Sequence, residues 1–453
     1  MEIPDIELAV ERIEAAITAE RVEDAVQILL QMHPADQAEI FQCLAEEKQD
    51  LLLPLLTVRE TADLLEELED EQVLETVEEI SAERLADILD EMEPDEAADL
   101  LGDLPENIAA AALAEMEDAE EVIPLLGYPD ETAGGLMTTS FIALRRQTTA
   151  AQAIEFLRQV GPTTEIPYYL YVVDRERRLT GVVGLRDLVV APPEVKMEAI
   201  ADPEIYYVTT GMDQEEVARS ISRYNLSAIP VVDDGMRLAG VITVDDIVDV
   251  LEDETTEDIY HLAGVESRPL SDKPYWSQRI VDVVRSRFFW LLILFVGGTF
   301  TGTILRQFEE ELQTVVTLSI FVPLLIGTGG NAGSQTVATV IRALSLREIR
   351  TRDALRVLWR EARTGLLLGL MIGIVALLRA LLWRVGWELS MTVAISVMAI
   401  CIWANLVAAL VPLFADRVGI DPTIVSGPLM TTLIDGTGLI IYFTLASLML
   451  PQL

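Results

Sequence analysis

Histidine and cysteine are almost absent from this sequence. His33 and His261 are its only histidines, and Cys43 and Cys401 are its only cysteines. Two cysteines in helical, apolar surroundings indicate no disulfide framework, and the shortage of both residue types argues against a site for soft transition metals. Neither histidine lies in a long apolar stretch, so the apolar stretches contain no histidine that could take part in a proton relay through a membrane.

Basic residues are also scarce. The chain has 32 Lys and Arg against 75 Asp and Glu, a net charge of −43, and residues 1–135 alone hold 40 of the acids and 5 of the bases. Such a surface repels nucleic acid and anionic lipid and attracts cations, so no nucleic-acid partner is expected.

Two further absences bear on location and chemistry. No basic segment followed by an apolar core opens the chain, so no cleavable signal is expected and the N-terminal part is predicted to stay in the cytoplasm. The sequence has no phosphate-cradling P-loop and no nucleophile–base constellation. An enzyme is therefore the least favoured function.

Residues 1–135 carry an internal repeat of twelve residues. Ala38–Leu44, Asp50–Leu56 and Ala62–Leu68 fall in register, each with apolar residues at the spacing of two helical turns. Helix breakers and cap formers such as Pro34 separate the blocks. The pattern predicts short stacked helices that form an α-helical superhelix, or small solenoid.

Residues 136–250 change to short β patterns between helical ones. The runs Tyr169–Asp174 and Gly181–Val189 recur as Ile229–Asp233 and Gly240–Val248. This α/β tandem resembles a pair of cystathionine-β-synthase (CBS) domains.

The second copy has Gly-x-x-Thr-x-x-Asp at Gly240–Asp246, the pattern that contacts a ribose in CBS domains. The resemblance therefore implies that Thr243 and Asp246 bind an adenine nucleotide such as ATP. The first copy departs from the pattern, with Gly184 where the threonine would stand. Many CBS pairs serve only as dimerising regulators, so both roles stay open.

Residues 251–280 are predicted to form an acidic connecting helix and a linker toward the membrane. Asp245, Asp249, Glu252 and Asp253 share one face of this helix. Like charges at that spacing destabilise a helix unless solvent or cations intervene. The helix is either a connector with a solvated face or a cation-sensing arm, and its place before the membrane favours the second reading.

Residues 281–453 are predicted to form an all-α transmembrane bundle of five helices, because five apolar stretches are long enough to cross a bilayer. Arginines cluster between the second and third stretches, from Arg342 to Arg363, whereas the loops at Glu309–Glu311 and Glu388 lack them. The positive-inside rule places the N-terminus and the arginine loop in the cytoplasm and the C-terminus outside, in a multi-pass plasma-membrane protein. The five stretches are Phe288–Leu305, Leu318–Leu344, Thr364–Trp383, Met391–Phe414 and Ile424–Leu450.

A single carboxylate, Asp435, lies within the last apolar stretch. A charge at that depth costs several kcal/mol unless it faces a polar cavity, so it marks an ion path. The alternative is an ion pair with Arg379 or Arg384 of a neighbouring helix.

Further polar and glycine residues accompany Asp435. The second stretch is interrupted at Pro323–Gln335, where glycines permit close backbone approach and amides supply oxygen ligands. Asp421 is expected to cap the last helix at its cytoplasmic end. The predicted pore metal ligands are Asp435, Asn331 and Thr431, and the predicted pore-lining residues are Gly329, Gly330, Gly333, Gln335, Pro428, Thr432 and Asp421.

Carboxylate and carbonyl oxygens suit Mg²⁺, Ca²⁺ or Mn²⁺. Because Mg²⁺ keeps several of its waters, a site for it needs few carboxylates, whereas Ca²⁺ asks for a richer oxygen cage. One aspartate per chain, doubled by a two-fold axis, would hold a hydrated dication, which favours Mg²⁺.

The stretch Pro323–Gln335 and the stretch Asp421–Asp435 are similar to the two signature motifs of the MgtE magnesium channel/transporter family. The order of domains matches that family over essentially the whole chain. The resemblance implies a homodimer with a pore on its two-fold axis, a hydrated Mg²⁺ held by Asp435 of both chains, and a connecting helix that acts as a gate plug. Gly436 departs from the family pattern, in which a branched residue is expected, and could soften the helix beside the pore aspartate.

The crowded acids suggest how such a pore would be regulated. Divalent cations that bridge the acidic domains would screen their repulsion, so high cytosolic Mg²⁺ is predicted to close the pore. The predicted regulatory metal ligands are Asp245, Asp246, Asp249, Glu252, Asp253, Glu257, Asp90, Glu91 and Asp95.

Three alternatives to a Mg²⁺-selective importer stay open. The chain could be a CBS-regulated membrane sensor without transport, or a transporter of a broader range of divalent cations, including Mn²⁺ and Co²⁺. A proton-coupled transporter is less favoured, because the spans hold one acid and no histidine.

Overall fold

The computed structural model describes residues 6–68, 70–77, 80–160, 169–267 and 278–450. The chain divides into two compact units, Met1–Glu252 and Asp253–Leu453, and each is described by itself. The linker that we expected within residues 251–280 falls largely on residues 268–277, which lie outside the described residues.

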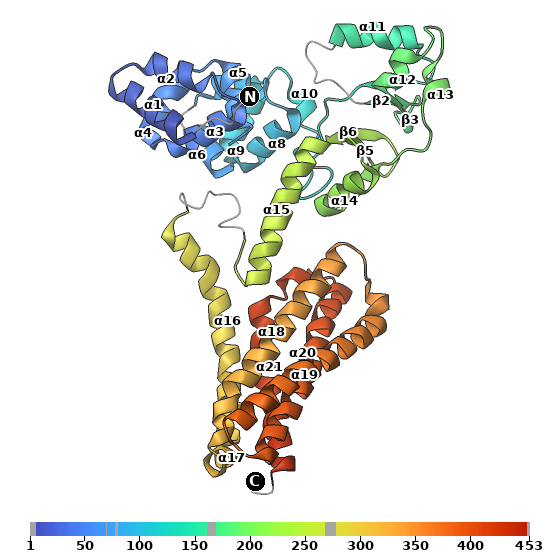
Figure 1. Cartoon of the computed structure of the whole chain (residues 1–453). Coiled ribbons are helices and arrows are strands. Elements are labelled where there is room, and N and C mark those ends of the chain that lie inside the picture. The colour runs from blue at the N-terminus through green and yellow to red at the C-terminus, as the bar shows by residue number, and fades with distance from the viewer. Residues whose placement is uncertain (1–5, 69, 78–79, 161–168, 268–277, 451–453) are drawn as a thin grey trace. The chain divides into compact units, whose positions relative to one another are not determined.

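The first unit begins with a series of short helices (Figure 1). From Pro34 to Glu106 they begin every twelve residues, as the repeat predicts, and most of them start at a proline or at a residue whose side chain caps the helix. α4 is an exception, because it follows Ala45 without a side-chain cap. Thr57 and Glu60, for example, form a reciprocal capping box at the start of one helix. The helices are α1 (Ile6–Thr18), α2 (Val22–Leu29), α3 (Pro34–Cys43), α4 (Glu46–Leu52), α5 (Val58–Leu65), α6 (Asp70–Val77), α7 (Ala82–Leu89), α8 (Pro94–Asp103), α9 (Glu106–Glu115) and α10 (Ala119–Val122), with a 3₁₀ turn, η1, at Leu53–Leu55.

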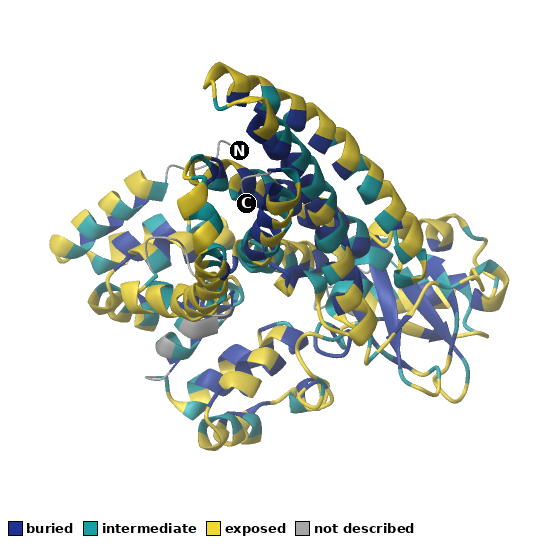
Figure 2. Ribbon diagram, turned by 90° about the horizontal axis from the view of Figure 1, so that it is seen from below, coloured by how far each residue is buried: buried dark blue, intermediate teal, exposed yellow. Residues whose placement is uncertain are grey.

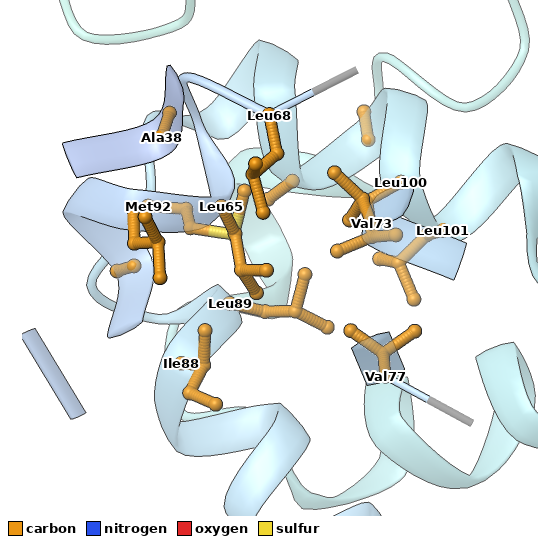
Figure 3. Close-up of a cluster of buried hydrophobic side chains, with 14 of the residues drawn as sticks. Ala38, Leu65, Leu68, Val73, Val77, Ile88, Leu89, Met92, Leu100 and Leu101 are labelled. Carbon is orange, nitrogen blue, oxygen red and sulfur yellow. The ribbon is translucent and has the colours of Figure 1, made fainter. Parts of the chain in front are cut away.

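These helices pack in two rows. α1, α3, α5, α7 and α9 contact one another in succession, and so do α2 with α4, α6 with α8, and α8 with α10. The chain therefore alternates between the rows from one helix to the next. Apolar side chains from both rows meet in one core, among them Leu65, Val73, Val77, Leu89 and Leu101 (Figure 3).

Two small three-stranded sheets follow. In each, the first strand pairs parallel with the second, and the second pairs antiparallel with the third. The second and third strands of each sheet have no exposed residue, whereas the short first strand is partly exposed and the helices expose one face (Figure 2). The first copy comprises β1 (Ala143–Arg145), α11 (Ala150–Val160), β2 (Tyr169–Val173), β3 (Leu179–Gly184), α12 (Leu185–Val190) and α13 (Met197–Ile200), and the second comprises β4 (Val208–Thr209), α14 (Gln214–Tyr224), β5 (Ala228–Val232) and β6 (Leu238–Thr243).

Equivalent turns of the two copies hydrogen-bond to each other. The backbone N–H of Leu179 donates to the carbonyl of Met236 at 3.0 Å, and that of Leu238 donates to the carbonyl of Arg177 at 3.2 Å. This reciprocal exchange joins the two copies as a pair. The repeat in the sequence therefore corresponds to a local two-fold relation in the fold.

The acidic connecting helix, α15 (Val244–Ala263), begins directly after β6. It is longer than its acidic stretch and ends at Gly264, whose φ of +72° is a left-handed conformation that glycine adopts without strain.

The second unit is helical. Its elements are α16 (Ile280–Gln307), α17 (Glu309–Thr314), α18 (Thr317–Ser345), a 3₁₀ turn η2 (Thr351–Asp353), α19 (Ala354–Leu382), α20 (Trp387–Val418), a 3₁₀ turn η3 (Pro422–Ile424) and α21 (Gly427–Met449). Within the described residues, four helices are long and apolar enough to cross a membrane, at Ile280–Gln307, Thr351–Leu382, Trp387–Val418 and Gly427–Met449.

The stretch predicted as the second span differs from its expected form. We expected an interruption at Pro323–Gln335, but α18 runs through this segment as one helix of 29 residues with Pro323 inside it. Close packing explains the continuity: a Cβ on Gly329 would lie 2.6 Å from Cγ2 of Ile400 in α20. The glycines thus serve helix–helix contact rather than a break in the backbone.

α19 packs along α20 through a ladder of glycines. A Cβ added to Gly365, Gly369 or Gly373 would lie 2.8 to 2.9 Å from backbone atoms of α20. Small residues at every fourth position allow two helix backbones to approach closely. Inside a bilayer, where the hydrophobic effect does not drive helices together, such close packing is the usual way in which they associate.

Candidate functional site

In the second unit, several polar side chains meet at the contact between α18 and α21. The hydroxyls of Ser334 and Thr431 are 3.1 Å apart, and each also donates to the carbonyl of Gly427, at 3.3 and 3.0 Å. A Cβ on Gly330 would lie 2.7 Å from Cγ2 of Thr431 and 3.5 Å from Oδ1 of Asp435. Gly330 therefore faces both Thr431 and the carboxylate, so the fold brings three of the predicted pore residues together.

Asp435 itself is half-buried on α21. Within the described part of the chain, its carboxylate has no hydrogen bond or ion pair with another side chain. Arg379, one of its expected alternative partners, instead places its guanidinium 4.5 Å from the ring centroid of Trp383. An ion pair that would explain Asp435 as a purely structural residue is thus absent from the described residues.

The remaining predicted pore residues are not all at this contact. Asn331 and Gln335 lie one turn apart on an exposed face of α18, and Thr432 donates its hydroxyl to the carbonyl of Pro428 within α21. Gly329 and Gly333 are buried beside Ile434, in helix packing.

The prediction that Asp421 caps the last helix is wrong. Asp421 accepts hydrogen bonds from the backbone N–H and the hydroxyl of Thr423, both at 2.8 Å, and so caps the short turn η3. The cap of α21 is Ser426, whose hydroxyl accepts from the N–H of Leu429 at 3.3 Å. The rigid Asp-Pro turn occupies the position just before the helix, which moves the helix start to the next capping residue.

Gly436 has a packing reason in this chain. A Cβ at this position would lie 2.9 Å from Cδ1 of Phe300 and 3.3 Å from Cδ1 of Ile304, both in α16. The branched residue expected there would collide with α16, so Gly436 allows α16 and α21 to pack closely.

Sequence reasoning missed the contact between the connecting helix and the start of α21. His261 of α15 lies 3.3 Å from the hydroxyl of Thr423 through Nδ1 and 3.5 Å from the carboxylate of Glu257 through Nε2. A Cβ on Gly264 would lie 3.4 Å from the hydroxyl of Ser426. The only signal in the sequence was the presence of one histidine at the end of an acidic helix.

A second group of acids lies in the first unit. Asp95 of α8 is 7% exposed, and its Oδ1 has no hydrogen-bond partner in the described structure. Burial, together with the charge of Asp246, raises the pKa of Asp95 from 3.8 to about 7. Burial also raises the pKa of Asp246, although the N–H and hydroxyl of Thr243 donate to its carboxylate at 3.1 and 2.7 Å.

The other predicted regulatory acids are placed differently. Asp90 accepts hydrogen bonds from the backbone N–H groups of Glu117 and Asp118, at 2.9 and 3.0 Å, which gives it a local structural role. Glu91, Asp245, Asp249, Glu252 and Asp253 are exposed, and Glu257 is partly buried. Among the described residues, no three His, Cys, Asp or Glu side chains converge closely enough to hold a metal ion by themselves.

Thr243 belongs to the lining of a cavity of about 950 Å³ in the first unit, together with Tyr169, Tyr171 and Ala228 of the CBS pair. Acids of the N-terminal helices, Asp63 and Glu66 among them, line the same cavity. The aromatic rings and the threonine in this lining suit a ligand with a flat ring and hydroxyl groups, whereas its many carboxylates suit a cation.

An acidic helical domain, a CBS pair and an apolar helical bundle, with a carboxylate that has no ion-pair partner in the part of the chain described, are together the features of a membrane transporter of cations. The chain matches the family described as "Divalent cation transporter" over residues 322–445, "MgtE intracellular N domain" over residues 32–131, and "CBS domain" over residues 133–194 and 197–253.

Known proteins resemble the chain over most of its length. It is 43% identical to "Magnesium transporter MgtE" of Thermus thermophilus over 330 residues, 73% of this chain and 72% of the relative, and 33% identical to the protein of that name from Bacillus subtilis over 435 residues, 96% and 95%. The chain belongs to the MgtE family, as its two motifs predicted.

Solved structures agree with this assignment. The soluble part of a magnesium transporter is similar with a TM-score of 0.50 and 35% identity, over 55% of this chain and 99% of that one. The cytosolic domain of the Mg²⁺ channel MgtE in complex with ATP has the same TM-score and identity, over 53% of this chain and 99% of that one.

Proposed function

We propose that this protein imports Mg²⁺ across the plasma membrane, with Asp435 in the permeation path and cytosolic Mg²⁺ closing the pore. The observation that carries the proposal is the Asp435 carboxylate, which has no ion-pair partner among the described residues and faces Thr431 and Gly330. A carboxylate kept inside an apolar bundle without a partner is costly unless it serves an ion path. Membership of the MgtE family supports Mg²⁺ as that ion, and we infer no catalysed reaction.

We infer that α18 is a fifth span. Its 29 residues would extend for about 43 Å at the rise of an α-helix, which exceeds the apolar thickness of a bilayer. Contacts with α20 and α21 shield its buried glycines from lipid, and the exposed amides of Asn331 and Gln335 would be tolerable if they faced the pore. Five spans would place the C-terminus outside a cell whose cytoplasm holds the N-terminal domains.

The pore would form in a homodimer. One chain offers one carboxylate and the exposed amides of Asn331 and Gln335, which is too little to enclose an ion. A second copy related by a two-fold axis would double each ligand, and two carboxylates with amide and hydroxyl oxygens suit a dication that keeps its water shell.

The regulatory site would include Asp95 and Asp246, and the two rows of N-terminal helices would form the superhelix that carries it. A buried carboxyl with an unpartnered oxygen beside a second carboxylate would be stabilised by a cation between them. Binding of Mg²⁺ there, and along the acidic face of α15, would favour a compact closed arrangement.

The CBS pair would make the transporter respond to a second ligand, a nucleotide, in addition to Mg²⁺. Thr243 and the tyrosines of the adjoining cavity offer a place for ATP, and the solved relative in complex with ATP supports this role.

The test is Mg²⁺ uptake into proteoliposomes that carry the full-length protein, as wild type, as Asp435→Asn and as Asp416→Asn. Uptake lost only in the Asp435 variant supports the proposal, because Asp416 is exposed near the end of α20 and serves as a matched control. Uptake that survives Asp435→Asn contradicts it. Absence of uptake in all three, with Mg²⁺-dependent compaction intact, would indicate the sensor. Uptake of Mn²⁺ or Co²⁺ at a rate equal to that of Mg²⁺ would indicate the broader transporter.

A further inference from the structure

The start of α19 carries a cationic face that the transport proposal does not use. Arg356, Arg360 and Arg363 are exposed, and so are Leu355 and Trp359 between them. Positions three and four apart lie on one side of a helix, so the arginines, the leucine and the tryptophan form a single surface. We call this surface, made of these five residues, the arginine face.

The arginine face continues into the apolar surface of the same helix. Leu366, Leu367, Leu370 and Met371 follow at helical spacing and are 44%, 62%, 51% and 67% exposed. The opposite side of α19 is covered by α20 through the glycine ladder. A surface with charges at one end and uncovered aliphatic side chains along the rest matches a phospholipid, which has a charged head and apolar chains.

The side chains at the charged end are arranged for a lipid headgroup. Trp359 is 66% exposed and Leu355 is 84% exposed, as expected at the boundary between apolar chains and headgroups. The guanidinium of Arg363 lies 5.8 Å from the centroid of the Trp359 ring, which holds it beside that boundary. Arg356 remains 89% exposed although Asp353 lies 3.9 Å away. Guanidinium groups recognise phosphate through paired hydrogen bonds.

We propose that the arginine face binds an anionic phospholipid, with its phosphate at Arg356, Arg360 and Arg363 and an acyl chain along Leu366 and Leu370. Charge complementarity and the exposed aliphatic side chains that continue the face identify the occupant, since an anionic phospholipid matches both ends of this surface. The acidic N-terminal helices are a weaker candidate, because they would meet Leu355 and Trp359 with charged side chains. Bound lipid would hold the N-terminal turns of α19 at the membrane surface.

The experiment uses the full-length protein in nanodiscs of phosphatidylcholine with or without phosphatidylglycerol. The protein is then transferred to mild detergent, and the lipid molecules that stay bound to it are counted by native mass spectrometry. The test variant is Arg356→Gln, Arg360→Gln, Arg363→Gln. The matched control is Arg306→Gln, Arg379→Gln, Arg384→Gln, which removes the same charge from residues spread over two helices and a loop. Because each arginine near an anionic surface contributes about a fivefold preference, phosphatidylglycerol retention should fall at least about tenfold in the test variant and little in the control.

A second measurement does not depend on retention in detergent. Brominated phosphatidylglycerol should quench the fluorescence of Trp359 more than brominated phosphatidylcholine does, as judged from the difference between wild type and Trp359→Phe. Equal retention of both lipids by the wild type, unchanged phosphatidylglycerol retention in the test variant, or equal quenching by both brominated lipids would overturn the proposal. None of these results bears on whether Asp435 conducts Mg²⁺.

Discussion

His261 and Thr423, 162 residues apart in the sequence, meet at 3.3 Å between Nδ1 and Oγ1. Thr423 in turn donates its hydroxyl to Asp421 at 2.8 Å, one turn before the helix that carries Asp435. The end of the connecting helix is thus joined through side chains to the segment that sets the start of α21. A movement of α15 would reach the pore helix by this route.

Replacing His261 with alanine should weaken closure by Mg²⁺. We expect residual uptake at high internal Mg²⁺ to rise several-fold, since a hydrogen bond of this kind contributes about 1 kcal/mol. A double-mutant cycle with Thr423→Val in the proteoliposome assay measures the coupling directly, and strictly additive effects would mean that the two residues do not act together. His33→Ala is the control, because His33 caps α3 in the first unit.

The local stability around Asp95 should depend on pH. Its folded-state pKa is raised from 3.8 to about 7, so its contribution to stability is fully present below about pH 4 and is lost as pH rises through about 7. Hydrogen exchange of the α8 amides should therefore speed up between about pH 4 and pH 7, after correction for the intrinsic rate, and Mg²⁺ should restore protection at pH 8.

Asp95→Asn should remove the response of this protection to Mg²⁺ and reduce its pH dependence, because the amide carries no charge. The raised pKa values of Asp246 and Glu96 would leave a smaller pH dependence. Asp87→Asn, at an exposed position of α7, should behave as wild type. If the Asp95 variant still responded to Mg²⁺ at α8, the regulatory metal would have to bind elsewhere.

Gly330→Ala should reduce Mg²⁺ uptake by about tenfold or more. The new methyl group would lie 2.7 Å from Thr431 and would push α21, with its carboxylate, away from α18. A displacement of about 1 Å at a functional site is enough for a loss of this size. Gly327→Ala in the same helix meets nothing within 4 Å and should transport normally. Equal uptake by the two variants would show that the contact does not position the site.

Gly369→Ala should destabilise the bundle by about 1 to 3 kcal/mol, since its Cβ would lie 2.8 Å from the Cα of Met398, which is backbone and cannot rotate away. The measurement is the thermal unfolding midpoint in detergent. Gly298→Ala has open space around it in α16, and should leave the midpoint unchanged or raise it slightly.

Local patterns predicted much of the fold. The starts of the helices from Pro34 to Glu106 follow the twelve-residue repeat, because most blocks contain their own proline or capping residue as well as an apolar stripe. The tandem of strand patterns likewise predicted two equivalent sheets. These features depend on residues that are neighbours in the sequence.

Features that depend on distant partners could not be predicted in the same way. The glycines of α18 suggested a break, and only their contacts with Ile400 and Thr431 show that they serve packing. α19 begins at Ala354, well before the predicted span at Thr364, because its first turns carry arginines that a search for apolar stretches excludes. The prediction of Asp435 as the key residue rests on its isolation in the sequence, whereas its proximity to Gly330 needs the fold.

The two alternating rows of N-terminal helices restrict how this domain can change in length. Removing one twelve-residue block would move every later helix into the opposite row, so that its apolar stripe would face the wrong neighbours. Removing two adjacent blocks would return the chain to its original row. Viable shorter or longer versions of this domain should therefore differ by an even number of helices.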